Sequence, residues 1–355
     1  MTLPTEPIGS IPRPPELVAG MQKAAEGSIS DAELAALFDQ AVSSTVRELE
    51  ATGSPVITDG EQSKPSFVTY PLAGLDTLAA DGVVIPFADG HTRQLPTLTA
   101  GPFRYATHAD SYLAAAQRVA TRPVKQAVIS ASAVSLLYPA DGIDGYPREA
   151  FLADLVDEAE ADIRGCLEAG AHNVQIDFTE ARLSLKLDPS GGLLRSFVDL
   201  NNQVLDRFSA EERASRIGVH SCPGGDHDST HSADIDYALL LPQLFDLHAG
   251  AFYLELAGEA DPEAVLEAVA ANVRPGQRVF VGVTDPIDPR VETPEQVCER
   301  ILLAAKHIPV AQLGTTDDCG FSPFADDAST ARETAFAKIR ARVQGTALAS
   351  ERLGV

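Results

Sequence analysis

Short apolar runs alternate with helical patterns along most of the chain, and this alternation restricts the fold more than any other feature. The runs are strand-length and nearly apolar throughout, which is typical of strands covered on both faces. Strands of this kind that are separated by helices form a parallel sheet. With an irregular first strand near 7–10, eight strands predict an α/β fold, the TIM (β/α)8 barrel. The other seven runs are 55–61, 126–132, 173–178, 216–222, 250–257, 278–286 and 311–319.

Several helical segments between the runs carry clear end signals. Residues 30–49 open with a Ser-Asp cap and repeat apolar residues at helical spacing. Residues 147–170 keep one apolar face and end at a glycine. A further helix follows Thr293, where Pro294 and Gln296 complete a capping box with proline in the first turn. We expect the first of these helices to form an N-terminal extension of the barrel.

Residues 82–105 interrupt the alternation. Two extended segments flank an Asp-Gly turn there, a pattern that predicts an inserted β-hairpin over one mouth of the barrel. The length of 355 residues lies within the range of one such barrel with extensions. We therefore expect a single domain over 1–355, with the hairpin as an insertion.

The charge balance excludes several classes of partner. The chain has 27 Lys and Arg against 51 Asp and Glu, which gives a formal net charge of -24. Such a chain repels phosphate backbones and anionic membrane surfaces, so we expect neither nucleic acid nor membrane as a partner. The sequence shows no signal peptide and no apolar stretch of membrane-spanning length, which predicts a cytoplasmic location. A homo-oligomer stays open.

Metal-binding residue types stand at the ends of the later runs, where barrels of this kind place their active sites. The fifth strand ends in His220 and Cys222, the sixth contains Glu255, and the eighth ends at Cys319. These nitrogen, sulfur and oxygen donors form a set that zinc accepts, and the wide spacing favours a catalytic site over a zinc finger. Ordinary core packing of the same residues is the alternative. The loop 223–234 adds histidines and aspartates that are either alternative ligands or part of a solvated loop.

Other polar residues near the strand ends give less specific signals. Glu61, Asp177 and Asp285 could bind a substrate ammonium, orient metal ligands or transfer protons. Arg182 and Lys186 could meet a substrate carboxylate or sulfonate, although exposure on a helix is the simpler expectation for both.

With these motifs in this order, the chain resembles the C-terminal catalytic barrel of the cobalamin-independent methionine synthases. The matching segments are IGSIPRP, DGEQ, VQID, HSC, GVTDPIDPRVETPEQV and DDCG, and they cover nearly the whole length. The resemblance implies a zinc-dependent methyltransferase of methionine biosynthesis. Its partners would be a small-molecule thiol, homocysteine, and a methyl donor, 5-methyltetrahydrofolate.

The resemblance also implies roles for individual residues. Ser10, Glu61 and Asp177 would lie near the amine and carboxylate of homocysteine. The cofactor would be zinc, which would hold the substrate sulfur as a thiolate. The implied zinc ligands are His220, Cys222, Glu255 and Cys319.

The chain departs from the family pattern at three places. Phe178 follows Asp177 where the family has a second acid. Ile287 stands where the family has a histidine that assists proton transfer, which leaves Asp177 and Asp285 as the candidate catalytic carboxylates. The chain has no tryptophan to stack on a folate, and Tyr138 is the nearest aromatic candidate for that contact.

Two other functions stay open. Epoxyalkane:coenzyme M transferases share the His-x-Cys pair and the distant cysteine, and in them a zinc-bound thiolate opens an epoxide. A basic pocket for a sulfonate would favour that activity. A zinc-binding protein without catalysis would use the same ligands as a closed site, and an open coordination position would argue against it.

Overall fold

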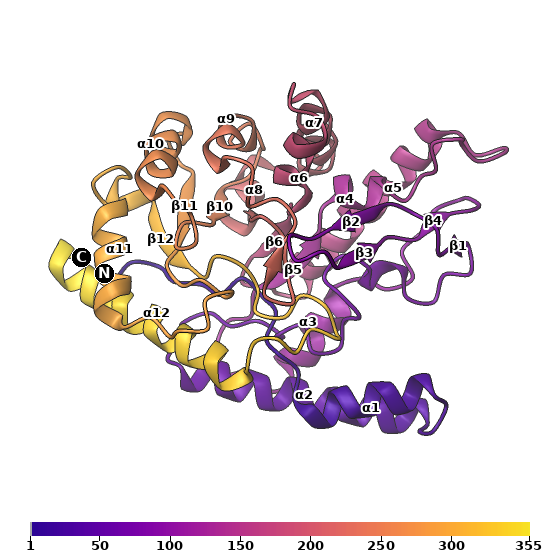
Figure 1. Ribbon diagram of the computed structural model, residues 1–355, viewed down its shortest axis with the longest axis horizontal. Helices are drawn as coiled ribbons and strands as arrows, with labels where there is room; N and C mark the ends of the chain where they lie inside the picture. The colour runs from indigo at the N-terminus through magenta and orange to yellow at the C-terminus, as the bar shows by residue number, and fades with distance from the viewer. Residues whose placement is uncertain (1) are drawn as a thin grey trace.

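The computed structural model describes residues 2–355 and confirms the predicted α/β barrel. Six parallel strands form the central sheet, and helices surround it (Figure 1). In chain order the strands are β5 (Gln126–Ile129), β6 (Val174–Asp177), β7 (Ile217–Ser221), β10 (Ala251–Leu254), β11 (Arg278–Gly282) and β12 (Leu313–Thr316). Each strand pairs with the next one in this series, so the sheet follows the order of the chain.

Two irregular segments complete the barrel beside the outermost strands of this sheet. Thr5 forms a parallel bridge to β12, and Ile57 forms one to the segment just before β5. The two segments are joined by the Ile11 amide, which donates to the Gly60 carbonyl at 3.0 Å. The first two expected strands therefore occupy barrel positions through single bridges and side-chain contacts, without a regular ladder.

The helices begin where the capping signals place them. A capping box at Ser30 precedes α2 (Asp31–Ala51), and another at Thr293 precedes α11 (Pro294–Ala304). None of the helices within residues 2–355 is long and apolar enough to span a membrane. The other helices are α1 (Pro15–Ala25), α3 (Asp110–Gln117), α4 (Ala131–Ser135), α5 (Arg148–Glu168), α6 (Glu180–Leu187), α7 (Gly192–Leu205), α8 (Ala210–Arg216), α9 (Leu241–Leu244), α10 (Pro262–Asn272) and α12 (Arg332–Leu353).

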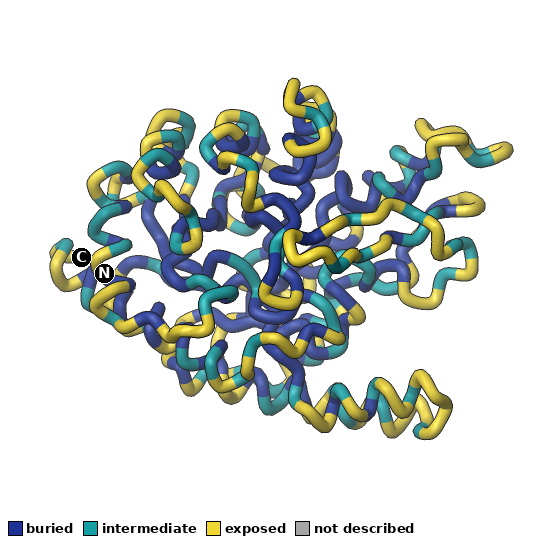
Figure 2. The backbone as a smooth tube through the Cα atoms, in the orientation of Figure 1, coloured by how far each residue is buried: buried dark blue, intermediate teal, exposed yellow. Residues whose placement is uncertain are grey.

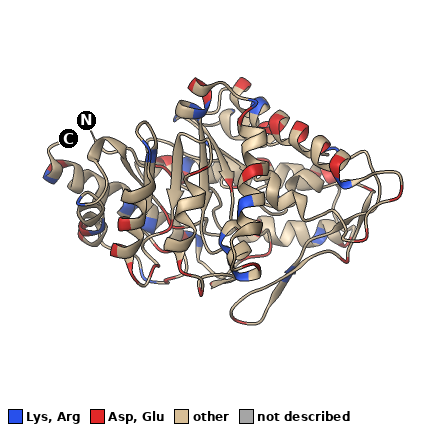
Figure 3. Cartoon of the chain, turned by 90° about the horizontal axis from the view of Figure 1, so that it is seen from above, with Lys and Arg blue, Asp and Glu red and all other residues tan. Residues whose placement is uncertain are grey.

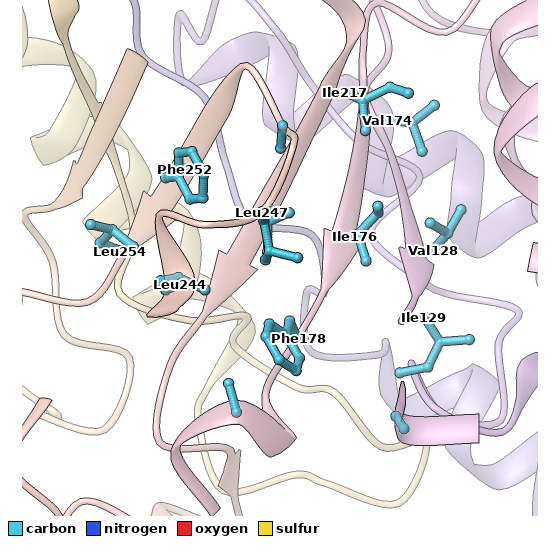
Figure 4. Packing of buried hydrophobic residues seen from close by; sticks show 14 of the residues in the cluster. Val128, Ile129, Val174, Ile176, Phe178, Ile217, Leu244, Leu247, Phe252 and Leu254 are labelled. Carbon is cyan, nitrogen blue, oxygen red and sulfur yellow. The ribbon is translucent and has the colours of Figure 1, made fainter. Parts of the chain in front are cut away.

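The apolar core lies between the strands and the helices that cover them. The strands are buried, whereas the exposed residues lie on the outer helices and loops (Figure 2). Val128, Ile176 and Leu254, from three strands, belong to one packed cluster (Figure 4). Phe252 of β10 is fully buried in the same cluster, with its ring centroid 4.7 Å from that of Phe245.

Charged side chains are also found inside the barrel, although many lie on the outer helices and loops (Figure 3). Lys125 Nζ lies 3.5 Å from a carboxylate oxygen of Glu6, and Arg342 Nε lies 3.0 Å from Asp317. All four residues are buried, so removing one partner would leave an uncompensated charge in the interior. These pairs tie the N-terminal segment to the residue just before β5, and α12 to the loop after β12.

Antiparallel hairpins lie beside the mouth at which the parallel strands end. One pairs β2 (Val84–Pro86) with β3 (Thr92–Gln94), and another pairs β8 (Gly225–Asp226) with β9 (Ser229–Thr230) just after β7. A third short pair joins β1 (Leu78–Ala79) to β4 (Thr97–Leu98). The Ala88 amide donates to the Thr230 carbonyl at 2.9 Å, so the first two hairpins are linked to each other.

The packing of β10 gives a test of the core. We expect Phe252→Ala to lower the free energy of unfolding by about 3–5 kcal/mol, because it removes a fully buried ring and leaves a cavity. Urea denaturation followed by circular dichroism measures this loss. Leu187→Ala, at a side chain that is 66% exposed, is the control and should change the value by less than about 0.5 kcal/mol. Equal effects of the two substitutions would contradict this description of the core.

Candidate metal centre and adjoining cavities

Three of the predicted metal ligands lie together at the mouth of the barrel. His220 is on β7, Cys222 directly follows that strand, and Cys319 follows β12. The sulfur atoms of Cys222 and Cys319 lie 3.1 Å apart. One ligand atom from each of the three residues lies within 4.8 Å of the others. The barrel therefore brings together side chains that are far apart in the sequence.

The ring of His220 is held in the orientation that a metal ligand requires. Its Nδ1 lies 3.1 Å from the carbonyl oxygen of Tyr253, so Nδ1 carries the proton and donates it to that oxygen. Its Nε2 is buried and has no hydrogen-bond partner among residues 2–355. A histidine with one nitrogen fixed by a backbone carbonyl and the other free beside two thiols has the arrangement of a metal ligand.

The two thiols of this group affect each other's ionisation. The hydrogen bond from Cys222 lowers the pKa of the Cys319 thiol well below its ordinary value. The same contact, together with burial, raises the pKa of Cys222 well above its ordinary value. The contact therefore favours a thiolate at Cys319 and a thiol at Cys222, and a bound cation would favour the thiolate form of both.

Glu255, the fourth predicted ligand, lies at the end of β10 and is paired with an arginine. Its Oε2 lies 3.2 Å from Nη1 of Arg182, which also pairs with Glu259. Burial raises the pKa of Glu255 well above its ordinary value. Within residues 2–355, the group of ligand atoms that lie within 4.8 Å of one another contains His220 and the two cysteines but not Glu255.

The expected exposure of Arg182 on its helix is wrong. Only 2% of the residue is exposed, because its guanidinium turns inward to Glu255 and Glu259 and donates to the carbonyl of Ile235. Lys186, one turn later on α6, is exposed as expected, and its Nζ forms an ion pair with Asp234 at 2.9 Å. The two residues have the same helical pattern in the sequence, so only packing distinguishes them.

A carboxylate that sequence reasoning did not single out connects the loops of the site. Asp318 accepts hydrogen bonds from the backbone amides of Leu256, Ala257 and Gly258 at 2.9, 2.9 and 2.6 Å. These bonds hold the loop after Glu255 against the loop that carries the neighbouring cysteine. The sequence signal that could have identified Asp318 is its position one residue before the candidate ligand Cys319.

The residues predicted to bind an amino acid surround a small cavity beside His220, Cys222 and Cys319, the candidate metal-binding group. Ser10, Glu61 and Asp177 line a space of about 20 Å³ together with His220 and Cys319. Asp177 lies directly across from His220 in the parallel register of β6 and β7. The barrel therefore places two carboxylates and a hydroxyl next to the histidine and one of the thiols.

Glu61 has a buried cation beside it that the sequence did not identify. Lys64 Nζ lies 3.2 Å from Glu61 Oε1 and donates to the carbonyl of Ala127 at 2.9 Å. Burial raises the pKa of Glu61 to about 7, against the opposing effect of Lys64 and with a further increase from Asp177. Burial also raises the pKa of Asp177.

A larger cavity of about 270 Å³ adjoins the small one. The two share Phe67, Thr179, Gly224 and Gly225 in their walls. Tyr138 is not among the residues that line either space. It is only 9% exposed, and its hydroxyl donates to the carbonyl of Tyr146 at 2.7 Å.

Asp285 and the loop 223–234 also lie near the candidate metal ligands. Asp285 lines a space of about 30 Å³ together with Glu255 and Cys319, and burial raises its pKa. In the loop, His231 lines the larger cavity, and burial lowers its pKa to about 4. A second group of candidate ligands, Asp226, His227 and Asp327, lies in the same region.

Fold and site together define a (β/α)8-barrel protein with a candidate metal-binding group of one imidazole and two thiols at the mouth where the strands end. The chain belongs to the family described as "Cobalamin-independent synthase, Catalytic domain", whose family model matches residues 3–344.

Similar proteins extend this comparison. A 5-methyltetrahydropteroyltriglutamate–homocysteine methyltransferase from Nitratidesulfovibrio vulgaris is 26% identical over 90% of this chain, which spans 39% of that protein. A methionine synthase from Sulfurisphaera tokodaii is 24% identical, with 99% of this chain and 94% of that protein covered. The chain thus spans about two fifths of the first relative and nearly all of the second.

Solved structures of low sequence identity share the fold. The B12-independent methionine synthase from Shewanella sp. W3-18-1, in complex with selenomethionine, matches with a TM-score of 0.76 at 18% identity over 99% of both chains. A putative vitamin-B12 independent methionine synthase from Listeria monocytogenes matches with a TM-score of 0.73 at 22% identity over 98% of both chains.

The buried pairing of Arg182 gives a test of the site's electrostatics. We expect Arg182→Met to lower the free energy of unfolding by about 3–5 kcal/mol at about pH 8, because Glu255 and Glu259 lose their cation. The pKa of Glu255 is raised in the folded state, so protonation at about pH 5.5 relieves the buried charge and the loss should become smaller. Urea denaturation at both pH values measures the difference.

Lys186→Met is the matched control for this experiment. It removes a cation one helical turn away, but the Lys186–Asp234 pair is exposed, so the loss should stay below about 1 kcal/mol. A loss of the same size in both variants, or one that does not depend on pH in Arg182→Met, would contradict the electrostatic explanation.

Proposed function

We propose that the protein is a zinc-dependent thiol S-methyltransferase that methylates homocysteine to methionine, with a 5-methyltetrahydropteroyl glutamate as the methyl donor. The observation that carries this proposal is the free Nε2 of His220 beside the thiols of Cys222 and Cys319, next to two adjoining cavities. The names of the Nitratidesulfovibrio and Sulfurisphaera relatives support the choice of reaction and substrates.

The donor set fits a zinc ion. His220, Cys222 and Cys319 would hold it through one nitrogen and two sulfur atoms, which are zinc's preferred ligands. We propose Glu255 as an exchangeable fourth ligand, because it directly follows the neighbouring strand β10, and to bind the ion it would have to leave Arg182. When bound, zinc would stabilise the thiolate form of a substrate thiol near neutral pH.

The chain's own residues would orient the amino acid. Glu61 and Asp177 would face the substrate ammonium, and that positive charge would favour the ionised form of both carboxylates. Ser10, whose hydroxyl accepts from the Ser322 amide at 3.1 Å, would lie near the carboxylate of homocysteine. We keep Asp285 as a proton-transfer candidate on the Glu255 side of the centre.

The adjoining space distinguishes a catalytic site from a closed structural one. A structural zinc site is fully enclosed by protein ligands, whereas a catalytic one keeps a position open to substrate. The cavity of about 270 Å³ gives room for a second substrate, and β2 and β3 of the inserted hairpin contribute Ile85 and Arg93 to its wall. We therefore propose that residues 1–355, with the hairpin near 82–105, act as one domain.

Metal content provides the first test. We expect the purified protein to hold about one zinc ion per chain, and Cys222→Ser and Cys319→Ser to lose most of it, because each removes a thiolate ligand. Elemental analysis without chelator in the buffers measures the content. Cys298→Ser, at a buried cysteine of α11, is the control and should keep its zinc. Retention of zinc by all three variants would contradict the proposed ligands.

Product formation provides the second test. We expect the zinc-loaded protein to form methionine from homocysteine and mono- or polyglutamylated 5-methyltetrahydrofolate, and Cys319→Ser to fall to background, because the thiol substrate is no longer activated. Chromatography of the products, with proton release on homocysteine binding in the same samples, measures both steps. Proton release without methionine would contradict the proposed methyl donor but not the activation of the thiol. Epoxides with coenzyme M would then be assayed.

A further inference from the structure

One wall of the larger cavity carries a buried carboxyl group, that of Glu180, the first residue of α6. The residue is only 5% exposed and lines the space of about 270 Å³. The wall of this cavity contains apolar side chains, such as Phe67, Leu136 and Leu183, and also the ion pair of Arg93 and Asp326. A carboxyl group in such a wall needs a partner, either from the protein or from a ligand.

The protein satisfies only one of the two oxygens of this carboxyl group. Glu180 Oε1 accepts from the hydroxyl of Ser130 at 2.6 Å and from the hydroxyl of Ser132. Asn201 on α7 donates to Ser132 at 2.7 Å and fixes that arrangement. Glu180 Oε2 is buried and has no hydrogen-bond partner within residues 2–355. The carboxyl group is thus held rigidly while one of its oxygens is left unpaired.

The surroundings allow this carboxyl group to carry a proton near neutral pH. Burial raises the pKa of Glu180 to about 7, and the negative charge of Asp177 on β6 adds to the increase, against the hydrogen bonds from the two serines. The other charged or titratable groups in the cavity wall are Arg93, Asp326 and His231. Arg93 is paired with Asp326 and with Asp226, so its charge is already compensated.

We propose that Glu180 is the general acid for the second substrate, and that its Oε2 hydrogen-bonds to the leaving atom of the alkyl donor and transfers a proton to it. This role rests on the proposed function. The large cavity shares four wall residues with the small cavity next to the thiols, so a donor bound there would meet both Glu180 and the activated sulfur.

The step balances as follows for a donor with a nitrogen leaving atom. The sulfur–carbon bond forms, the carbon–nitrogen bond breaks, and the electron pair passes to nitrogen. That nitrogen takes the proton from Glu180, which becomes a carboxylate and is reprotonated from solvent. The expected donor class is therefore a molecule whose leaving atom is an uncharged nitrogen or oxygen that must be protonated as it leaves. A 5-methyltetrahydropteroyl glutamate and an epoxide both meet this requirement, whereas iodomethane does not.

The test compares zinc-loaded wild type with Glu180→Gln on three electrophiles, with homocysteine as the thiol. With 5-methyltetrahydropteroyl triglutamate or epoxypropane, whichever the wild type uses, we expect the substitution to lower the rate by about 100- to 1000-fold. With iodomethane, corrected for the reaction without protein, the two should agree within about twofold, because iodide leaves without a proton. Glu149→Gln, at an exposed position of α5, is the control.

The pH profile separates a general acid from a structural role. The protonated form of Glu180 is the active one, so the wild-type rate should fall as pH rises through about 7, and this limb should be absent in Glu180→Gln. Zinc content and circular dichroism should be the same in both proteins.

Three outcomes of the comparison between the variants would overturn the role of Glu180. They are an unchanged rate with the donor that the wild type uses, an equal loss with iodomethane, and an alkaline limb that persists in Glu180→Gln but disappears in Asp285→Asn. Use of iodomethane alone by the wild type would also overturn it, while leaving thiol activation intact. Failure of the wild type with all three electrophiles would instead contradict the proposed function itself.

Discussion

The parallel register of β6, β7 and β10 is the constraint on which the site depends. This register sets Asp177, His220 and Tyr253 side by side on neighbouring strands. Only in this register does the Tyr253 carbonyl meet Nδ1 of His220 and leave Nε2 free beside the thiols. A slip of one residue would turn every side chain of the strand to the opposite face. The backbone ladder therefore fixes both the position and the tautomer of the histidine.

Buried acids outnumber buried cations around this mouth, which explains its electrostatic character. Glu61, Asp177, Glu255 and Asp318 are all buried, and burial raises the pKa of each. Lys64 and Arg182 offset part of this charge through ion pairs. A cation bound among these carboxyl groups would favour their ionised forms and so offset the effect of burial.

Sequence patterns predict the parts of the molecule that depend on local chemistry or on strand order. The capping boxes at Ser30 and Thr293 fix their helices, and the strand-end rule points to the histidine and cysteines that the barrel brings together. Sequence patterns could not predict whether a helical side chain is buried or exposed when its neighbours come from distant loops. Arg182 and Lys186 share one pattern, yet the first is buried against Glu255 and the second is exposed. The sequence also could not show the contacts of Tyr138, whose hydroxyl donates to the carbonyl of Tyr146 and whose ring packs against that of Phe151.

The candidate metal ligands and the larger cavity are built from different parts of the fold. The metal-binding residues stand at the ends of strands, whereas much of the cavity wall comes from hairpins and loops. These loops are held together by the Ala88–Thr230 hydrogen bond and by Arg93, which pairs with Asp226 and Asp326. Loops on a rigid scaffold can change without disturbing the strands. On the proposed function, the choice of electrophile would therefore depend on the hairpins and on Glu180, while activation of the thiol would depend on the barrel.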